Sequence, residues 1–372
     1  MPIKKDMELK RNSSTRISLY YILASLITSI IISGCGDNKS TRDKSNQVSV
    51  EDMTGKSVMV PQSQDIKKIA VLTSPQVLDV YAIGLQDRLC GITDEVKNLE
   101  LLNMFDPHLK KVSAVRTQEG QVNTQALLDA DPDIVISSED DMESIEKSSQ
   151  VTTIRINSSR SQGSISRIRD EMRFVGRVFN KQEKAEQYVS YLDNILSLIK
   201  FTLADMPAEN RVKVFMGFNA GHLATYGSDS FMDDWIKAAG CVNAAGSISG
   251  TGEKEGGLVT VSMEQVMSWD PDIVIIDNGD PDALLNDPSW SKLKAVQNKK
   301  VYRLPKGILD WNQVSLEGAA MVPQWLGVTA YPDKLNFLNM NDQASGFYTN
   351  IFALRFSDNL IHKILYPSQD QK

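Results

Sequence analysis

The chain contains few of the residues that build metal sites or disulfide-rich folds. Among its 372 residues there are only three cysteines and three histidines. Cys90 and Cys241 form no CxxC pair and each lies in an apolar stretch, so we interpret both as buried thiols. The histidines are too scattered to converge on a bare zinc, manganese or nickel ion. We therefore expect no metal site made by the protein alone.

Motifs for catalysis are also missing. The sequence has no GxSxG nucleophile elbow, no HExxH zinc motif and no GxxxxGK[ST] phosphate loop. The glycine-rich stretch 250–257 lacks the closing Lys–Ser/Thr pair of such a loop. Asp233 and Asp234 are adjacent, so on a helix they would point apart and make a poor acid–base pair. These absences favour a protein that is not an enzyme, with a hydrolase or lyase and a purely structural role left open as alternatives.

The N-terminus is basic and then strongly apolar. Five basic residues precede an uncharged apolar run, 17–32, which closes on Ile32-Ser33-Gly34-Cys35. This is the pattern of a secretory signal, and a run of about 16 residues is shorter than a membrane-spanning helix needs. The last four residues resemble a lipobox, in which the cysteine receives diacylglycerol and becomes the new N-terminus. We expect residues 1–34 to be a lipoprotein signal peptide and Cys35 to be lipidated, which places the protein outside the cytoplasm on a lipid anchor. The alternative is an uncleaved anchor helix.

The remaining chain is acidic. Cleavage before Cys35 leaves 35 basic and 45 acidic residues over 338 positions, a balance that argues against nucleic acid as a partner. Residues 35–49 are polar and without apolar periodicity, so we expect a flexible tether.

One unit occurs twice. Residues 122–136 read VNTQALLDADPDIVI and residues 261–275 read VSMEQVMSWDPDIVI, so that Asp131-Pro132-Asp133 corresponds to Asp270-Pro271-Asp272. Each copy predicts a short helix, a turn with proline and a continuous apolar strand, which is typical of a parallel sheet covered on both faces. The sequence therefore predicts two α/β lobes of related construction.

Further elements fill in the two lobes. In the first we expect strands at 68–72 and 89–93 and a helix at 75–84; in the second, strands at 212–217 and 300–304 and a helix at 230–240. Between them, 165–203 is rich in helix formers, and Asn180 followed by Glu183 has capping-box spacing for a long helix. The expected divisions are an N-terminal lobe at 50–180, an interlobe helix at 181–206 and a C-terminal lobe at 207–372.

The order of these features resembles a known family. The lipobox, the paired helix–turn–strand units and the helix between them are similar to the substrate-binding proteins of ABC importers for iron complexes, haem and cobalamin. The same resemblance is carried by GLQDRLCGIT, GSDSFMDDWIKAAGCVNAAG, KKVYRLPKG and WLGVTAYPDKL, and it covers about 50–364. It implies two Rossmann-like lobes joined by one long helix, with a cleft between them and little hinge motion.

The same resemblance implies a function. It indicates an extracytoplasmic binding lipoprotein, monomeric and without a cofactor, that delivers a chelated metal complex such as a siderophore, haem or a corrinoid to a membrane permease. A lipid-anchored hydrolase, or a binding protein for a nickel or cobalt chelate, is the alternative. In the family an acidic residue on each lobe docks against permease arginines. Here the positions are Glu264 and, by the 139-residue offset, Gln125, so the N-terminal lobe departs from the pattern; nearby Glu119 is a possible substitute.

Ligand contacts are expected on loops at the strand ends, at 73–75, 116–120, 218–227 and 307–312. Arg116 could pair with a carboxylate or catecholate oxygen, Trp311 could offer a flat face, and Tyr226 could ligate ferric iron or donate a hydrogen bond. His222 and Asn312 complete the candidate set. The alternatives are a solvated charge for Arg116, a core position for Trp311, a structural role for Tyr226 and a locally bonded His222.

Overall fold

The computed structural model describes residues 46–138, 145, 151–156, 164–219, 223–249, 258–277 and 279–367. They belong to one compact unit, Lys44–Lys372. The expected signal peptide, Cys35 and His222 lie outside the described residues. Within the described ranges no helix is long and apolar enough to cross a lipid bilayer. The expected tether ends sooner than predicted, because strand β1 (Gln47–Glu51) pairs antiparallel with β2 (Ser57–Pro61).

The first lobe is built on a five-stranded sheet in which all strands are parallel. In sheet order the strands are β5 (Ser113–Arg116), β4 (Leu89–Thr93), β3 (Ile69–Val71), β6 (Ile134–Ser137) and β7 (Thr153–Arg155). Its helices are α1 (Val77–Ala82), α2 (Asp94–Lys97), α3 (Glu100–Phe105) and α4 (Thr124–Ala130). Short 3₁₀ turns are η2 (Ser74–Gln76), η3 (Gln86–Arg88) and η4 (Pro107–Lys111). Strands β3 and β6 are buried throughout, as predicted for a sheet covered on both faces.

The second lobe has a mixed sheet. Strands β8 (Lys213–Asn219), β10 (Val242–Asn243), β12 (Ile273–Ile276) and β13 (Val301–Arg303) are parallel, whereas β9 (Leu223–Tyr226) pairs antiparallel with both β8 and β11 (Leu258–Thr260). Its helices are α8 (Phe231–Ala238), α9 (Met263–Trp269), α10 (Pro281–Leu285) and α11 (Lys294–Gln297), and η7 (Ala208–Asn210) precedes the sheet. The antiparallel edge was not predicted. The link from β8 to β9 is too short for the crossover that a parallel neighbour requires.

The repeated DPD motif makes the same connection in both lobes. Asp131 ends α4 and Asp270 ends α9, each in the left-handed conformation, with φ of 48° and 43°. The second aspartate of each copy then accepts backbone N–H groups at the start of the neighbouring strand: Asp133 Oδ2 from Lys68 N at 2.9 Å, and Asp272 Oδ2 from Lys213 N at 2.9 Å. The motif therefore fixes the register of the two central strands of each sheet, β3 with β6 and β8 with β12.

Two helices lie between the sheets, and the second of them is the long interlobe helix predicted at 181–206. Helix α6 (Ile165–Val178) is followed by α7 (Gln182–Thr202). The prediction that Asn180 caps the start of α7 is wrong. Asn180 instead ends α6 and has φ of 52°. At this end Lys181 N donates to Gly176 O at 2.7 Å, and Asn180 N donates to Arg177 O. This is a Schellman ending, which turns the chain sharply so that α7 packs on α6. The chain finishes in α12 (Leu316–Ala330), α13 (Met340–Phe352) and α14 (Asp358–Leu365).

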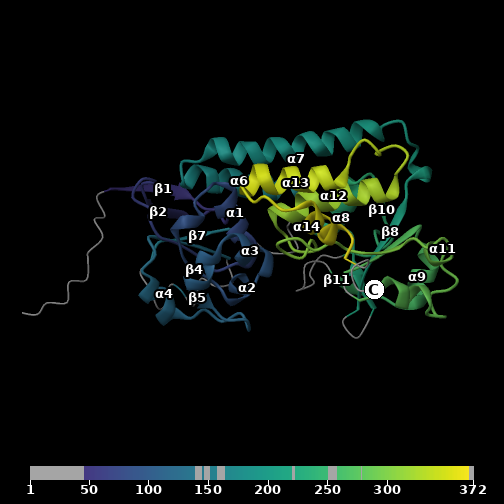
Figure 1. Ribbon diagram of the computed structural model, residues 1–372, viewed down its shortest axis with the longest axis horizontal. Helices are drawn as coiled ribbons and strands as arrows, with labels where there is room; N and C mark the ends of the chain where they lie inside the picture. Colours follow the sequence, from purple (N-terminus) through teal and green to yellow (C-terminus); the bar gives the residue numbers. More distant parts are fainter. Residues whose placement is uncertain are drawn as a thin grey trace, which may run out of the picture. The chain divides into compact units, whose positions relative to one another are not determined.

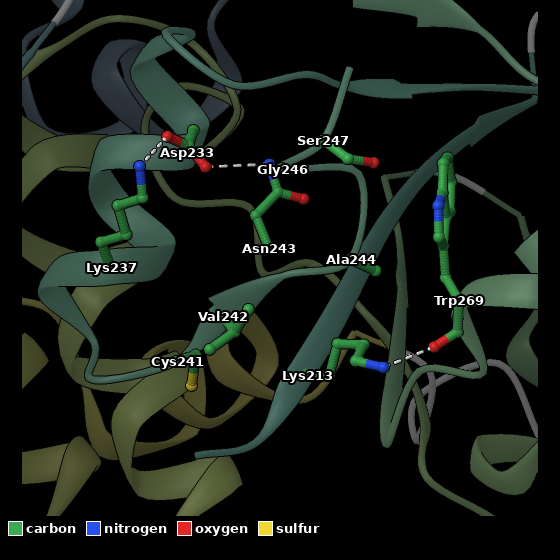
Figure 2. Close-up of a pocket in the computed structure, with 10 residues that line it drawn as sticks. All are labelled: Lys213, Asp233, Lys237, Cys241, Val242, Asn243, Ala244, Gly246, Ser247 and Trp269. Atoms are coloured by element: carbon green, nitrogen blue, oxygen red, sulfur yellow. Dashed lines mark hydrogen bonds and ion pairs between the residues drawn. The ribbon is translucent and has the colours of Figure 1, made fainter. Parts of the chain in front are cut away.

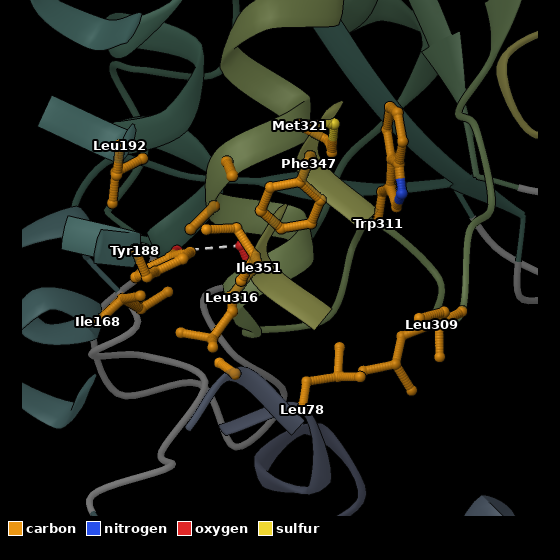
Figure 3. Close-up of a cluster of buried hydrophobic side chains, with 14 of the residues drawn as sticks. Leu78, Ile168, Tyr188, Leu192, Leu309, Trp311, Leu316, Met321, Phe347 and Ile351 are labelled. Atoms are coloured by element: carbon orange, nitrogen blue, oxygen red, sulfur yellow. Dashed lines mark hydrogen bonds between the residues drawn. The ribbon is translucent and has the colours of Figure 1, made fainter. Parts of the chain in front are cut away.

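The helices share one core with both sheets. Figure 1 shows α7, α12 and α13 running side by side, and α12 contacts both α7 and α13. One buried apolar cluster includes Ile69 of the first sheet and Val214 of the second. Figure 3 shows part of it, where Leu78 of α1, Tyr188 of α7 and Phe347 of α13 lie around the start of α12. Because this apolar surface is shared, separating the lobes would expose it to water.

Candidate ligand-binding site

The carboxyl ends of the first sheet carry a row of polar side chains. Parallel strands end at one edge, and the order β5-β4-β3-β6 places Arg116, Thr93, Ser74 and Ser137 along it in turn. The hydroxyls of Ser74 and Thr93 are 2.7 Å apart, and the Thr93 hydroxyl also accepts from Val96 N at the start of α2. The edge therefore carries hydroxyl groups beside one guanidinium, although Ser74, Thr93 and Ser137 are only 7%, 3% and 0% exposed.

Arg116 ties two of the predicted loops together. Its Nη1 donates to Leu72 O at 2.9 Å, at the end of β3, and its Nε donates to Gly120 O at 3.0 Å. Gly120 has φ of 85°, a conformation that glycine adopts without strain, which lets the 116–120 loop fold back onto the arginine. The predicted loops 73–75 and 116–120 thus lie next to each other, while contact of Arg116 with a ligand stays a prediction.

In the second lobe the loop after β13 is organised by Glu317, a residue that the sequence did not single out. Glu317 has no exposed surface and accepts from Ile308 N and Leu309 N, both at 2.9 Å. The Trp311 indole N–H, at 3.3 Å, and the Tyr348 hydroxyl also donate to it. Burial raises the pKa of Glu317, whereas these donors oppose the rise. The carboxylate therefore joins residues 308, 309 and 311 of the 306–312 loop to Tyr348 of α13.

Gly307 allows this arrangement. A Cβ at position 307 would overlap the Glu317 carboxylate and the Tyr348 hydroxyl, so the loop can close over the buried acid only because glycine stands there. Lys306 and Asp310 form an ion pair of 2.9 Å across the base of the loop. Its exposed side is therefore charged and polar, and its buried side is fixed.

The other candidate residues lie in different surroundings. Trp311 has no exposed surface, and Tyr226 is 4% exposed, at the end of β9 with its ring edge-on to Phe231. In this conformation both belong to the core beneath the loops, as the alternative interpretations had it, and neither presents a face to solvent. Asn312 is half-buried on the loop that Glu317 holds. Ligand contact by these three residues stays a prediction.

The strand-end loops of the two lobes touch. Gln313 Nε2, which follows the 306–312 loop, donates to Glu95 Oε1 at 3.3 Å, and Glu95 lies in α2 directly after β4. The polar row of the first sheet and the loop fixed by Glu317 therefore lie on two sides of the same junction.

The two expected docking positions occupy matching places. Gln125 is near the start of α4 and Glu264 near the start of α9, and both are exposed. Gln125 Nε2 donates to Asp129 Oδ1 at 2.8 Å on its own helix. Glu264 keeps its charge, and its own backbone N–H together with the Ser262 side chain lowers its pKa. Glu119 is also exposed, with a pKa lowered by its backbone N–H and by Thr117.

Two hollows of the described chain lie away from these loops. The one in Figure 2, of ≈ 390 Å³, is lined by Lys213, Lys237 and Trp269 among others; Lys213 begins β8, so it lies at the amino end of the sheet. A second, of ≈ 380 Å³, lies between Tyr81 and the end of α13. In the described ranges no group of three or more His, Cys, Asp and Glu residues could hold a metal ion.

Comparison with known proteins places the chain. Residues 69–307 match the family model described as periplasmic binding protein. The chain belongs to the periplasmic binding protein family. A periplasmic solute binding protein of Veillonella parvula superposes with a TM-score of 0.73 at 27% identity, covering 86% of this chain and 97% of that one. As a member of the family, the chain is a substrate-binding protein of an ABC transporter.

Its curated relatives differ in what they bind. The Fe(3+)-citrate-binding protein YfmC of Bacillus subtilis is 21% identical over 304 residues, which cover 79% of this chain and 90% of the relative. The molybdate-binding protein MolA of Haemophilus influenzae is 25% identical over 193 residues, which cover 51% of this chain and about half, 52%, of the relative. At these identities the relatives share the architecture, and the ligand is a separate question.

Proposed function

We propose that this protein captures a chelated metal complex, of the ferric siderophore, haem or corrinoid class, between the strand-end loops of its two lobes and delivers it to a membrane permease. The observation that carries the proposal is the Gln313–Glu95 hydrogen bond, because it brings the loops of both lobes to one junction. A ligand held there contacts both lobes at once, which is the position that open α/β sheets offer to small molecules.

The chemistry of the junction supports an oxygen-rich ligand. Ser74 and Thr93 supply hydroxyls, Arg116 supplies a guanidinium, and Asn312 and Gln313 supply amides. These groups hydrogen-bond to carboxylate, catecholate or oxo oxygens, whereas a bare metal ion would need converging carboxylates or imidazoles. The names of the relatives, with ferric citrate and molybdate, fit such a ligand and set the competing outcomes of the test.

A ligand screen tests the proposal. Ferric citrate, a ferric catecholate siderophore, haemin, cobalamin, molybdate and a nickel–histidine complex are each added, and the melting temperature and the tryptophan fluorescence are followed. We expect one of the chelates to raise the melting temperature, since binding to the folded state at 100 times Kd stabilises it by about 2.7 kcal/mol. Arg116→Ala should weaken that binding, and Arg177→Ala on the exposed face of α6 should not. If molybdate alone binds, the cargo is a free oxyanion; if nothing binds, the proposal is wrong.

We further propose that the protein is anchored outside the cytoplasm through Cys35. The Ile32-Ser33-Gly34-Cys35 pattern supports this, as does the lipoprotein YvrC of Bacillus subtilis, 23% identical over 327 residues. Cys35→Ser should release the protein from the membrane fraction into the soluble extracytoplasmic fraction, because serine cannot form the thioether. Cys241→Ser, at a buried and free thiol, is the control that should stay membrane-bound. If Cys35→Ser also stays in the membrane, the uncleaved-helix alternative is correct.

Docking to the permease is proposed to depend on Glu264 of the second lobe. Its exposed carboxylate can form charge-assisted pairs with arginines, whereas Gln125, at the matching position of the first lobe, offers only an amide. The docking surface is therefore asymmetric in charge.

A further inference from the structure

Two buried acidic residues, Asp79 and Glu171, lie next to the predicted ligand loop after β3. They are not part of the polar row at the strand ends. Asp79 is 1% exposed on α1, and Glu171 is 5% exposed on α6. Gln76, the last residue of η2, is also 1% exposed, and its Nε2 donates to Glu171 Oε1 at 2.9 Å. The segment 73–79 therefore joins the end of β3 directly to helix α6 through these side chains.

The hydrogen bonding of the pair requires a proton. Among the residues that the structure describes, none donates to Asp79 Oδ2, although that atom is buried. The side chains of Asp79 and Glu171 lie within hydrogen-bonding reach of each other, and two carboxyl groups can form such a bond only if one of them carries a proton. Two carboxylates without a proton would repel each other in a site from which water is excluded.

The surrounding charges balance a single negative charge. Arg167, one turn earlier on α6, faces Glu171 and lowers its pKa against the larger effect of burial. Arg169 is paired with Asp193 at 2.6 Å. From α7 the neutral Tyr188 faces the pair, and its hydroxyl donates to Leu316 O at the start of α12, as Figure 3 shows. Burial is the main cause that raises the pKa of Asp79 well above its ordinary value.

We infer that Asp79 and Glu171 share one proton and act as a positioning pair that links the ligand loop 73–76 to helix α6 in a pH-dependent way. The link to ligand binding rests on the proposed function, but the pair itself does not. Loss of the shared proton leaves two like charges facing each other, which pushes α1 and η2 away from α6. The loop that carries Ser74 then loses its fixed position.

The direction of the pH dependence follows from the proton count. Unfolded Asp and Glu ionise at about pH 3.9 and 4.3, whereas the folded pair keeps one proton above that range. Unfolding therefore releases a proton, so the stability supplied by the pair is full below those values and falls as pH rises, until the folded pair also ionises. One released proton lowers the folding equilibrium constant tenfold per pH unit.

Asp79→Asn tests the inference, because its carboxamide donates to Glu171 without a titrating proton. Denaturant unfolding between pH 5 and pH 9 measures how the folding equilibrium constant changes with pH. In Asp79→Asn this dependence should be weaker than in the wild type by up to tenfold per pH unit, which corresponds to one proton. Asp170→Asn, at an exposed position on the same helix, should keep the wild-type slope. After correction for the base-catalysed rise of the intrinsic exchange rate, the protection factors of 73–82 should fall at pH 9 in the wild type and not in Asp79→Asn. Equal slopes for wild type and Asp79→Asn would overturn the inference.

Two further measurements guard against a variant that does not fold. In Glu171→Gln the carboxamide at position 171 donates to Asp79, so this variant should also weaken the pH dependence of the folding equilibrium constant. In the wild type at pH 7, infrared spectroscopy should show the carbonyl stretch of a protonated carboxyl group, and its absence would also contradict a shared proton. None of these experiments uses a ligand, so an unsuccessful ligand screen and a failed proton-sharing pair are distinguishable.

Discussion

Glu317→Ala is expected to lower the free energy of unfolding by about 4 kcal/mol, the largest effect of any single substitution proposed for this protein. The change leaves four donors inside the protein without their acceptor: the N–H groups of Ile308 and Leu309, the Trp311 indole and the Tyr348 hydroxyl. Each buried group left unpaired costs about 1–3 kcal/mol, and water entering the cavity recovers part of the sum. Denaturant unfolding followed by circular dichroism measures the change.

Two companion variants separate the hydrogen bonds from the mere loss of a side chain. Glu317→Gln keeps the shape but replaces one acceptor oxygen by a donor, so we expect a loss of about half that size. Glu183→Ala, at an exposed acid in the first turn of α7, should change stability by no more than about 0.5 kcal/mol. If Glu317→Ala were as stable as Glu183→Ala, the buried carboxylate would not be what fixes the loop.

Glu264→Arg is expected to reduce uptake of the cargo by on the order of a hundredfold while leaving ligand affinity unchanged. If Glu264 docks as proposed, the substitution replaces a charge-assisted pair with a permease arginine, worth about 1.5–3 kcal/mol, by repulsion between like charges. Glu264 is exposed on α9 and has no part in the ligand loops, so binding of the chelate to the isolated protein should not change. Transport into vesicles that contain the permease measures the first effect, and fluorescence titration measures the second.

The matching test on the first lobe uses Gln125. Gln125→Glu restores a carboxylate on the first lobe and should raise uptake if that lobe also meets an arginine. Glu183→Arg, the same charge reversal on α7, should leave uptake as it is. A loss of ligand affinity in Glu264→Arg, or unchanged uptake, would contradict the docking role.

The two lobes could be predicted from the sequence because the structure of each DPDIVI unit is determined by residues that are close together in the chain. A left-handed aspartate, a proline and a continuous apolar strand follow one another within a few residues, so each unit specifies its turn and its burial without help from distant parts of the chain. The antiparallel pairings of β9 with β8 and with β11 were missed, because the apolar pattern of a strand does not show in which direction its neighbour runs.

The buried acids could not be predicted in the same way. Asp79, Glu171 and Glu317 each lie in a helix where an acidic residue ordinarily faces solvent, and their burial depends on helices far away in sequence. Glu317, two residues after the helix-capping Ser315, looks like any first-turn acid. Asn180 shows the opposite error, since its capping-box spacing is real but the residue ends α6 instead of starting α7. The spacing of residues a few positions apart does not show whether an acidic residue is buried, or whether a capping residue starts one helix or ends another.

Hydrogen exchange of the protein with and without its chelate tests the central claim most directly. If the ligand lies at the junction of the two lobes, its binding should slow exchange simultaneously in 72–76 and 93–95 of the first lobe and in 306–313 of the second. Exchange around Lys213 and Trp269, where the hollow of Figure 2 lies, should not change. Protection confined to one lobe, or centred on that hollow, would contradict the account.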